Sequence, residues 1–214
     1  MIRARANRAF YRQHILDWSH RIEDNEFITA AVKQGGSVVD GIQAFQALML
    51  PLSPRNQRRV AEHHANRYLN RALSTSQPFS RWNAIGPQSG KGKLRIGYAS
   101  GDTGDHITAR LMRSVFALHD RNKFEIIIYA LTPDDGSQTR RDIMAAADMF
   151  VDLTQLDNAA AAKRIHDDGV AVLFQLDGHT ARTRMEINAL RPAPLQIMHI
   201  GFPGTTGASY IDQV

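Results

Sequence analysis

An aspartate and a histidine four positions apart, Asp102 and His106, are the side chains best placed in this sequence for acid–base chemistry. They lie in a loop rich in glycine and aspartate, between an apolar strand that starts at Leu94 and an amphipathic helix that starts near Ile107. The positive end of a helix dipole disfavours a charged imidazole, so we expect a neutral His106 that can accept a proton. The alternative interpretation is that Asp102 or Asp105 caps the helix and His106 is a surface residue.

Two further loops also follow apolar stretches. Gly178-His179-Thr180 follows the stretch 170–176, and the segment 201–207 holds three glycines and a proline. Ligands of an open parallel sheet bind beyond the carboxyl ends of its strands, where all three loops are expected. We interpret the Gly-His-Thr segment as a plain turn. The glycine-rich segment either brings backbone amides close to a ligand or is a tight turn.

The elements that must position these loops alternate between strand and helix after Lys93. Apolar strands are predicted to begin at Leu94, Phe124, Phe150, Val170 and Leu195, with helical patterns between them. Such alternation, at roughly 20–30 residues per unit, predicts an α/β fold with a parallel, doubly wound, Rossmann-like sheet.

A helical region is predicted ahead of the sheet, over residues 1–75. Apolar residues recur at helical spacing at Ile15, Trp18 and Ile22, and again over 38–49. Ser53-Pro54 predicts the start of a further helix, because serine caps helices and proline favours the first helical position. The segment 76–93 is rich in Ser, Pro, Gly and Gln and is predicted to be a linker, which leaves 94–214 as the sheet lobe.

Composition excludes several classes of protein. The 214 residues are 43% hydrophobic and 22% charged, which is typical of a globular chain. The apolar runs are too short to cross a bilayer, and the N-terminus lacks the apolar core of a secretory signal, so no membrane partner is expected. Without cysteine there are no disulfides or thiolate metal sites, and we expect a cytoplasmic location. His63-His64 lacks metal-ligand spacing, so no metal is expected.

Charge is uneven along the chain. Residues 1–93 hold 14 Lys and Arg against 6 Asp and Glu, whereas residues 94–214 hold 12 against 15. A basic half would suit an acidic partner, but a solvated helical face is the interpretation that we favour. Nucleic acid is not expected as a partner, because no aromatic platform accompanies the scattered arginines.

A family resemblance extends along nearly the whole chain. It is carried by LRIGYASGDTGDHITARLM at 94–112, KFEIIIYALTPDDG at 123–136, RIHDDG at 164–169, ALRPAPLQ at 189–196 and GFPGTTG at 201–207. In this order the motifs resemble the catalytic region of the protein O-GlcNAc transferases. Asp17-Trp18 and Pro51-Leu52-Ser53 are similar to the family's segment ahead of that region.

The resemblance implies an inverting glycosyltransferase with two Rossmann-like lobes. Such enzymes move N-acetylglucosamine from UDP-GlcNAc to Ser or Thr hydroxyls of proteins, with no metal or other cofactor. The implied partners are therefore acceptor proteins and the donor UDP-GlcNAc. The matching site positions are His106 and Asp102 as the catalytic loop residues, Thr108 as a sugar-side contact, and Ile200, Gly201 and Pro203 as the turn that lines the sugar pocket.

Some residues depart from the family pattern. Thr103 stands where the family usually has Phe, and Ile107 where animal members have Pro. Phe45 takes the place of a histidine that contacts the substrate in animal members, so no sugar contact is expected from the N-terminal helices. Asp105 replaces an Asn, and an extra carboxylate beside His106 would raise the pKa of that histidine, so that it is protonated and less available as a base.

The resemblance also implies what the family has beyond these residues. Family members carry tetratricopeptide repeats before the catalytic region and a UDP-binding lobe after the glycine-rich turn. Neither matches any part of this sequence, so we expect a fragment that is inactive alone. The alternative is a non-catalytic interaction module, derived from the same lobe, that binds protein or an acidic surface.

Overall fold

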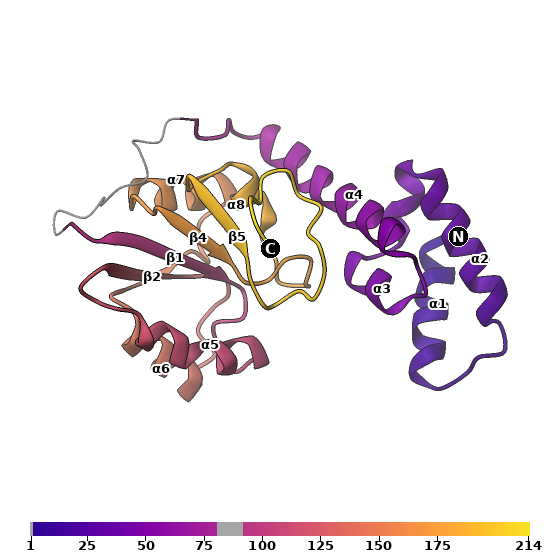
Figure 1. Ribbon diagram of the computed structural model, residues 1–214, viewed down its shortest axis with the longest axis horizontal. Helices are drawn as coiled ribbons and strands as arrows, with labels where there is room; N and C mark the ends of the chain where they lie inside the picture. Colours follow the sequence, from indigo (N-terminus) through magenta and orange to yellow (C-terminus); the bar gives the residue numbers. More distant parts are fainter. Residues whose placement is uncertain (1, 81–91) are drawn as a thin grey trace. The chain divides into compact units, whose positions relative to one another are not determined.

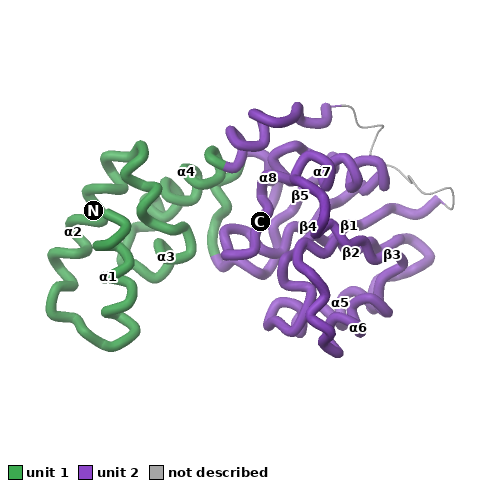
Figure 2. Tube along the Cα trace, turned by 180° about the vertical axis from the view of Figure 1, so that it is seen from behind, with its two compact units in different colours: residues 1–67, 204–208 green, residues 68–203, 209–214 purple. Residues whose placement is uncertain are grey.

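A computed structural model describes residues 2–80 and 92–214 (Figure 1). The chain divides into two compact units (Figure 2). The first comprises residues 1–67 and 204–208, and the second comprises residues 68–203 and 209–214. Most of the predicted linker, residues 81–91 of 76–93, lies outside the described residues.

The second unit is built on a parallel five-stranded sheet with the order β3-β2-β1-β4-β5. Its strands are β1 (Leu94–Ser100), β2 (Phe124–Ala130), β3 (Met149–Asp152), β4 (Val172–Gln175) and β5 (Leu195–Met198). The predicted parallel α/β sheet is therefore confirmed. The strand expected over 170–176 is shorter than predicted, because pairing with β1 covers only its middle.

Helices cover both faces of the sheet. Figure 1 shows α5 (Ile107–Leu118) and α6 (Gln138–Ala146) on one face, with α7 (Asn158–Asp167) and α8 (Met185–Ala189) on the other. On the α5–α6 face, Tyr98, Ile126 and Ile128 pack with Met112 and Phe116 in one core. Because both faces are covered, β2 is apolar almost throughout, and its last five residues are fully buried.

The first unit is helical. It contains α1 (Ile2–His14), α2 (Arg21–Gln34), a short 3₁₀ helix η1 (Gly36–Gly41), α3 (Ala44–Met49) and most of α4 (Pro54–Leu73). As predicted from Ser53-Pro54, α4 begins at Pro54, and Ser53 Oγ accepts the Asn56 N–H at 3.3 Å. Among the described residues, no helix is both long enough and apolar enough to cross a membrane.

The predicted helix through Ile15, Trp18 and Ile22 is wrong. Helix α1 ends at His14, and the three apolar side chains are 75%, 50% and 73% exposed. Leu16 adopts the left-handed φ of 58°, and Asp17 Oδ1 accepts from both the N–H and the hydroxyl of Ser19. These local side-chain bonds stabilise a turn in place of helix. The pattern over 38–49 is likewise divided, between η1 and α3.

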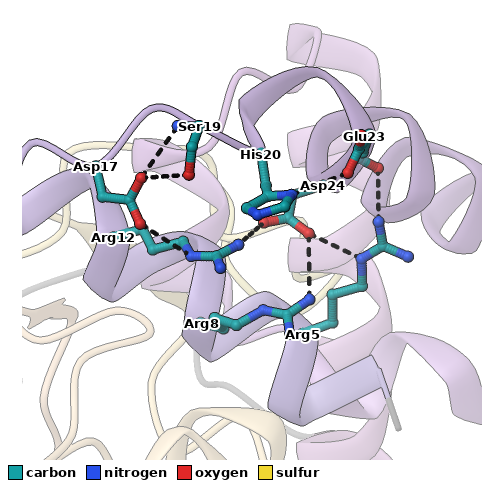
Figure 3. A network of polar contacts seen from close by, with 8 residues as sticks. All are labelled: Arg5, Arg8, Arg12, Asp17, Ser19, His20, Glu23 and Asp24. Atoms are coloured by element: carbon teal, nitrogen blue, oxygen red, sulfur yellow. Dashed lines mark hydrogen bonds and ion pairs between the residues drawn. The ribbon is translucent and has the colours of Figure 1, made fainter.

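One buried carboxylate joins α1 to α2. Asp24 of α2 is 2% exposed and binds three arginines that lie on one face of α1 (Figure 3). Its oxygens lie 2.8 Å from Arg5 Nε, 3.7 Å from Arg8 Nη2 and 3.3 Å from Arg12 Nη1. Burial raises the pKa of Asp24, but the hydrogen bond and charge of Arg5 and the charge of Arg8 outweigh it and lower the pKa below its ordinary value. Part of the basic charge of the N-terminal half therefore holds this helix pair together.

Replacing this carboxylate should loosen the first unit. We expect Asp24→Ala to lower the free energy of unfolding by roughly 2–3 kcal/mol, less than for a fully buried pair because the arginines are partly exposed. A carboxyl with a lowered pKa stabilises the fold above its unfolded-state pKa, and this contribution is lost as pH falls through the folded-state value. The difference between parent and variant in urea denaturation should therefore shrink below about pH 4.

The neighbouring Glu23 provides a matched control. Its side chain is 68% exposed and forms an ion pair with the exposed His20 ring. Glu23→Ala should change the free energy of unfolding by less than about 0.5 kcal/mol. Equal losses in the two variants would show that Asp24 has no special part in joining the helices.

Candidate functional site

The order of the strands reverses between β1 and β4. From β1 the chain moves outward through β2 and β3, and then crosses back so that β4 and β5 extend the sheet on the other side. In open parallel sheets, ligands bind beyond the carboxyl ends of the strands at this reversal. The loop 101–106 follows β1 and the turn starting at Asp177 follows β4, so both lie at this point.

The two loops are joined by the carboxylate of Asp177, which is completely buried. Ser100 Oγ donates to Asp177 Oδ1 at 2.6 Å, and the Gly101 N–H donates to Oδ2 at 2.8 Å. The Asp102 N–H in turn donates to Ser100 Oγ at 2.9 Å. Gln175 Oε1 accepts the Asp177 N–H at 2.6 Å. The backbone that carries Asp102 is therefore fixed from β4.

The structure brings the side chains of Asp102 and His106 together in loop 101–106. His106 is the N-cap of α5, and its Nδ1 lies 3.3 Å from the Thr108 N–H nitrogen and 3.3 Å from Asp102 Oδ2. Arg182 Nη1 lies 3.5 Å from Asp102 Oδ1. The Asp102 carboxylate is 6% exposed, whereas the imidazole is 38% exposed.

The contacts of Nδ1 give each tautomer of the His106 ring a partner. Without a proton, Nδ1 accepts the Thr108 N–H, as expected for a histidine at a helix N-terminus. With a proton, Nδ1 faces the Asp102 carboxylate, and the lone pair of the other ring nitrogen, Nε2, becomes available. An imidazole oriented by a carboxylate in this way can act as a general base.

The glycine-rich turn after β5 meets the end of β4. A Cβ built on Gly201 would lie 1.7 Å from the Leu176 carbonyl oxygen and 3.5 Å from Asp177 Cα, so only glycine fits there. Ile200 has a left-handed φ of 61° and is 45% exposed, and Pro203 is also exposed. Gly201 thus lies beside the Asp177 junction, which is the set of hydrogen bonds that joins Asp177 to Ser100 and Gly101. No hydrogen bond or ion pair within residues 92–214 links Ile200 or Pro203 to His106.

Sequence reasoning missed the residues that hold the far side of loop 101–106. Arg140 of α6 is 2% exposed, donates to Thr103 Oγ1 and lies over the Phe150 ring at 4.6 Å. Asp135 Oδ2 accepts the Asp105 N–H at 2.6 Å. This bond, with those from Ser137, lowers the pKa of Asp135 to about 2.

The expected effect of Asp105 on His106 is opposed by an ion pair. The Asp105 carboxylate binds Arg110, with 2.6 Å between Oδ1 and Nη2. Arg110 lies on the first turn of α5, and its charge offsets the extra carboxylate. The positive charge of Arg110 therefore reduces the electrostatic effect of the Asp105 carboxylate on His106.

Asp177, Ser100 and Arg182 were also missed. The available signal was a polar residue directly after the apolar stretch 170–176, where parallel sheets bind ligands. The residues that follow, Gly178-His179-Thr180, are those that the sequence predicts to form a plain turn. His179 is 7% exposed and packs between the Tyr68 ring, with centroids 5.9 Å apart, and the Phe202 ring at 5.2 Å. Its observed contacts are those of a packed side chain.

Across residues 2–80 and 92–214, no three His, Asp or Glu side chains gather so that they could hold a metal ion. The expectation that no metal or cofactor takes part stays a prediction.

Comparisons with known proteins agree with the fold and the motifs. The family described as Glycosyl transferase family 41 matches residues 32–214. The chain is 36% identical over 177 residues to a UDP-N-acetylglucosamine--peptide N-acetylglucosaminyltransferase of Caenorhabditis elegans, which covers 81% of this chain and 15% of that protein. It is 37% identical over 179 residues to the probable enzyme SEC of Arabidopsis thaliana, named for the same activity, which covers 82% of this chain and 18% of that protein.

A solved structure shares the fold. The K341M mutant of a Thermobaculum terrenum O-GlcNAc transferase superposes with a TM-score of 0.68 and 23% identity, over 91% of this chain and 39% of that one. At this identity the likeness establishes the fold alone. The chain spans less than a fifth of the length of the two curated relatives.

The buried Asp177 should make stability depend on pH. Burial raises its pKa to about 7, although the Ser100 and Gly101 hydrogen bonds oppose this, and the Asp102 charge adds to it. An unfolded aspartate releases its proton near pH 4, so between about pH 4 and 7 the folded chain holds a proton that the unfolded chain does not. The free energy of unfolding is therefore expected to fall as pH rises through this window.

Asp177→Asn should remove this fall. Measured by urea denaturation between about pH 5 and 8, the parent should lose roughly 2–3 kcal/mol more than the variant. Asp152→Asn is the control, because Asp152 also ends a strand but is exposed and has a lowered pKa. Parallel pH profiles for the parent and Asp177→Asn would contradict the titration of Asp177 in this range.

Proposed function

Because the chain belongs to glycosyl transferase family 41, we propose that it forms one lobe of an enzyme that transfers N-acetylglucosamine from UDP-GlcNAc to serine or threonine hydroxyls of proteins. The resemblance to protein O-GlcNAc transferases found in the sequence is thereby confirmed at the level of the family. The observation that carries the proposal is the Asp102–His106 pair, positioned after β1 where the order of the strands reverses.

The proposed step is an inverting displacement. The acceptor hydroxyl attacks the anomeric carbon of the sugar on the face opposite UDP, a new C–O bond forms, the bond to UDP breaks, and the hydroxyl proton must leave. In the tautomer whose Nδ1–H faces Asp102, His106 Nε2 takes that proton. The Asp102 carboxylate, 3.3 Å from Nδ1, then stabilises the charged imidazole.

Further residues are proposed to contact the sugar. Gly201 brings backbone to the carboxyl edge beside β4, and the exposed Ile200 and Pro203 flank it in the same turn. Thr108 is buried, and its N–H donates to His106 Nδ1 when that nitrogen carries no proton. We propose that this turn lines the sugar pocket, with the diphosphate held by a second lobe that follows in related enzymes.

An interaction module is the alternative function. It is favoured by one observation, a cluster of exposed apolar side chains at the turn between α1 and α2. These are Tyr11, Ile15, Leu16, Trp18 and Ile22. Of the basic residues that suggested an acidic partner, three are bound to Asp24 and are less available for one.

Replacing His106 tests the catalytic proposal. In a protein that joins this chain to a UDP-binding lobe, His106→Ala should lower kcat for peptide glycosylation about 10²–10⁴-fold, because the positioned proton acceptor is lost. The free energy of unfolding should change little, since the imidazole is partly exposed. Asp102→Asn separates the roles, because it keeps the loop but removes the charge that stabilises the protonated ring.

His20→Ala is the matched control. His20 is an exposed histidine of the first unit whose ring Nδ1 lies 3.1 Å from the Glu23 carboxylate. Turnover in this variant should stay within about twofold of the parent. If His106→Ala also stayed within about threefold, a difference below 1 kcal/mol, His106 would be neither the base nor a positioning group.

Donor binding tests the division of the site between two lobes. We expect the 214-residue chain alone to bind UDP with a Kd weaker than about 1 μM, equivalent to about 8 kcal/mol, because the resemblance assigns the UDP contacts to the second lobe. Titration calorimetry with UDP measures this directly. Sub-micromolar binding would show that the nucleotide site lies within this chain.

A further inference from the structure

The completely buried carboxylate of Asp177 cannot touch a substrate, yet it lies at the centre of the site. We propose that Asp177 is a positioning residue, which sets the geometry of the Asp102–His106 pair through Ser100 and Gly101. The inference rests on the proposed function of that pair. Asp177 lies 75 positions after Asp102 in the sequence, so only the fold brings the two together.

The first step runs from Asp177 to the backbone of Asp102. The Ser100 hydroxyl has one proton, and Asp177 Oδ1 accepts it at 2.6 Å. With its proton committed, Ser100 Oγ turns a lone pair toward the Asp102 N–H, which it accepts at 2.9 Å. The second carboxylate oxygen accepts the Gly101 N–H at 2.8 Å. Two successive amides of the loop are therefore fixed by one carboxylate.

The second step runs from the backbone of Asp102 to His106. With its N–H fixed, the Asp102 side chain places Oδ2 3.3 Å from His106 Nδ1, and Arg182 Nη1 lies 3.5 Å from Oδ1. Gly101 is packed against the backbone and Cβ of Arg182, where an added Cβ would approach to 2.6 Å. The start of the loop thus has little room to move unless the Asp177 bonds break.

The charges around Asp177 make this junction sensitive to pH. The groups that face it are the hydroxyl of Ser100, the N–H of Gly101, the amide of Gln175 and the negative Asp102, whose own neighbours are His106 and Arg182. His179, two positions on, packs between rings.

The ionised carboxylate of Asp177 offers acceptors to both donors. A protonated carboxyl turns one oxygen into a donor and weakens one of the two bonds. Because burial raises the pKa of Asp177 to about 7, the loop should be held more firmly above neutral pH than below it.

The test uses this chain itself and needs no transferase activity. Hydrogen exchange of the Gly101 and Asp102 amides reports the junction, and the ring ¹⁵N resonances of His106 report the tautomer that faces Asp102. Asp177→Asn keeps the shape but replaces one acceptor oxygen with an N–H₂ donor, so the Ser100 hydroxyl and the Gly101 N–H cannot both donate to it as they do in the parent. It should speed exchange of both amides by about tenfold or more and shift the His106 resonances. Asp152→Asn, at the end of β3, should change neither.

Ser100→Ala provides a second, independent variant. It removes the link to Asp102 but leaves the Asp177 bond to Gly101, so only the Asp102 amide should exchange faster, with the same shift at His106. If both residues act along one path, the double variant should disturb His106 no more than Asp177→Asn does. Ser100→Ala also decides the matter if Asp177→Asn does not fold.

Three outcomes would overturn the inference. They are His106 resonances that match the parent in Ser100→Ala, the same result in a folded Asp177→Asn, or fully additive effects in the double variant. The proposed function fails separately. If His106→Ala keeps full turnover while these resonances move as expected, Asp177 positions the pair but the pair is not catalytic.

Discussion

The parallel pairing of β1 with β4 is the contact on which the rest of the site depends. β1 pairs with β2 on one side and β4 on the other, and the bond from the Leu176 N–H to the Ala99 carbonyl extends the second pairing past the end of β4. This extension sets Asp177 beside Ser100. A shift of one residue in the register would turn Asp177 to the opposite face of the sheet and separate it from the β1 loop.

Two buried carboxylates in this chain, Asp24 and Asp177, have pKa shifts in opposite directions because their surroundings differ. Both Asp24 and Asp177 have lost most of their water, which raises the pKa of each. Asp24 faces three guanidinium groups, which outweigh that cost and keep it ionised. Asp177 accepts from the neutral Ser100 hydroxyl and Gly101 N–H and lies near the like charge of Asp102, so burial dominates and its pKa rises. Asp24 therefore belongs to a structural ion-pair cluster. Asp177 instead lowers the stability of the fold when it ionises, and it does so at a candidate functional site.

One departure from the family pattern, Thr103, helps to hold loop 101–106 in place. Thr103 supplies a hydroxyl that accepts from the buried Arg140, a contact that a phenylalanine could not make. Thr132 Oγ1, after β2, donates to the Gly101 carbonyl at 2.7 Å. Loop 101–106 is therefore held from β4 through Asp177 and from α6 and the β2 turn on its other side. This double support fits a site whose side chains must keep their distances while a substrate binds.

Much of the fold and part of the site could be read from the sequence. Period and turn residues predicted the alternating strands and helices, the start of α4 at Pro54, and the loop that carries Asp102 and His106, because these elements depend on residues that are close together in the sequence. The motifs also identified the family. The turn at Leu16 was missed, because the bond from Ser19 to Asp17 competes with a helical pattern that apolar spacing alone suggests.

Only the tertiary structure decided how the loop is held. Asp177, Arg140 and Arg182 lie between 37 and 80 positions from their partners in the loop, and nothing in local spacing ties them to it. The order of the strands brings these residues together. Burial then determines the protonation of Asp177, because its pKa depends on the water it has lost and on the charges that the fold places beside it.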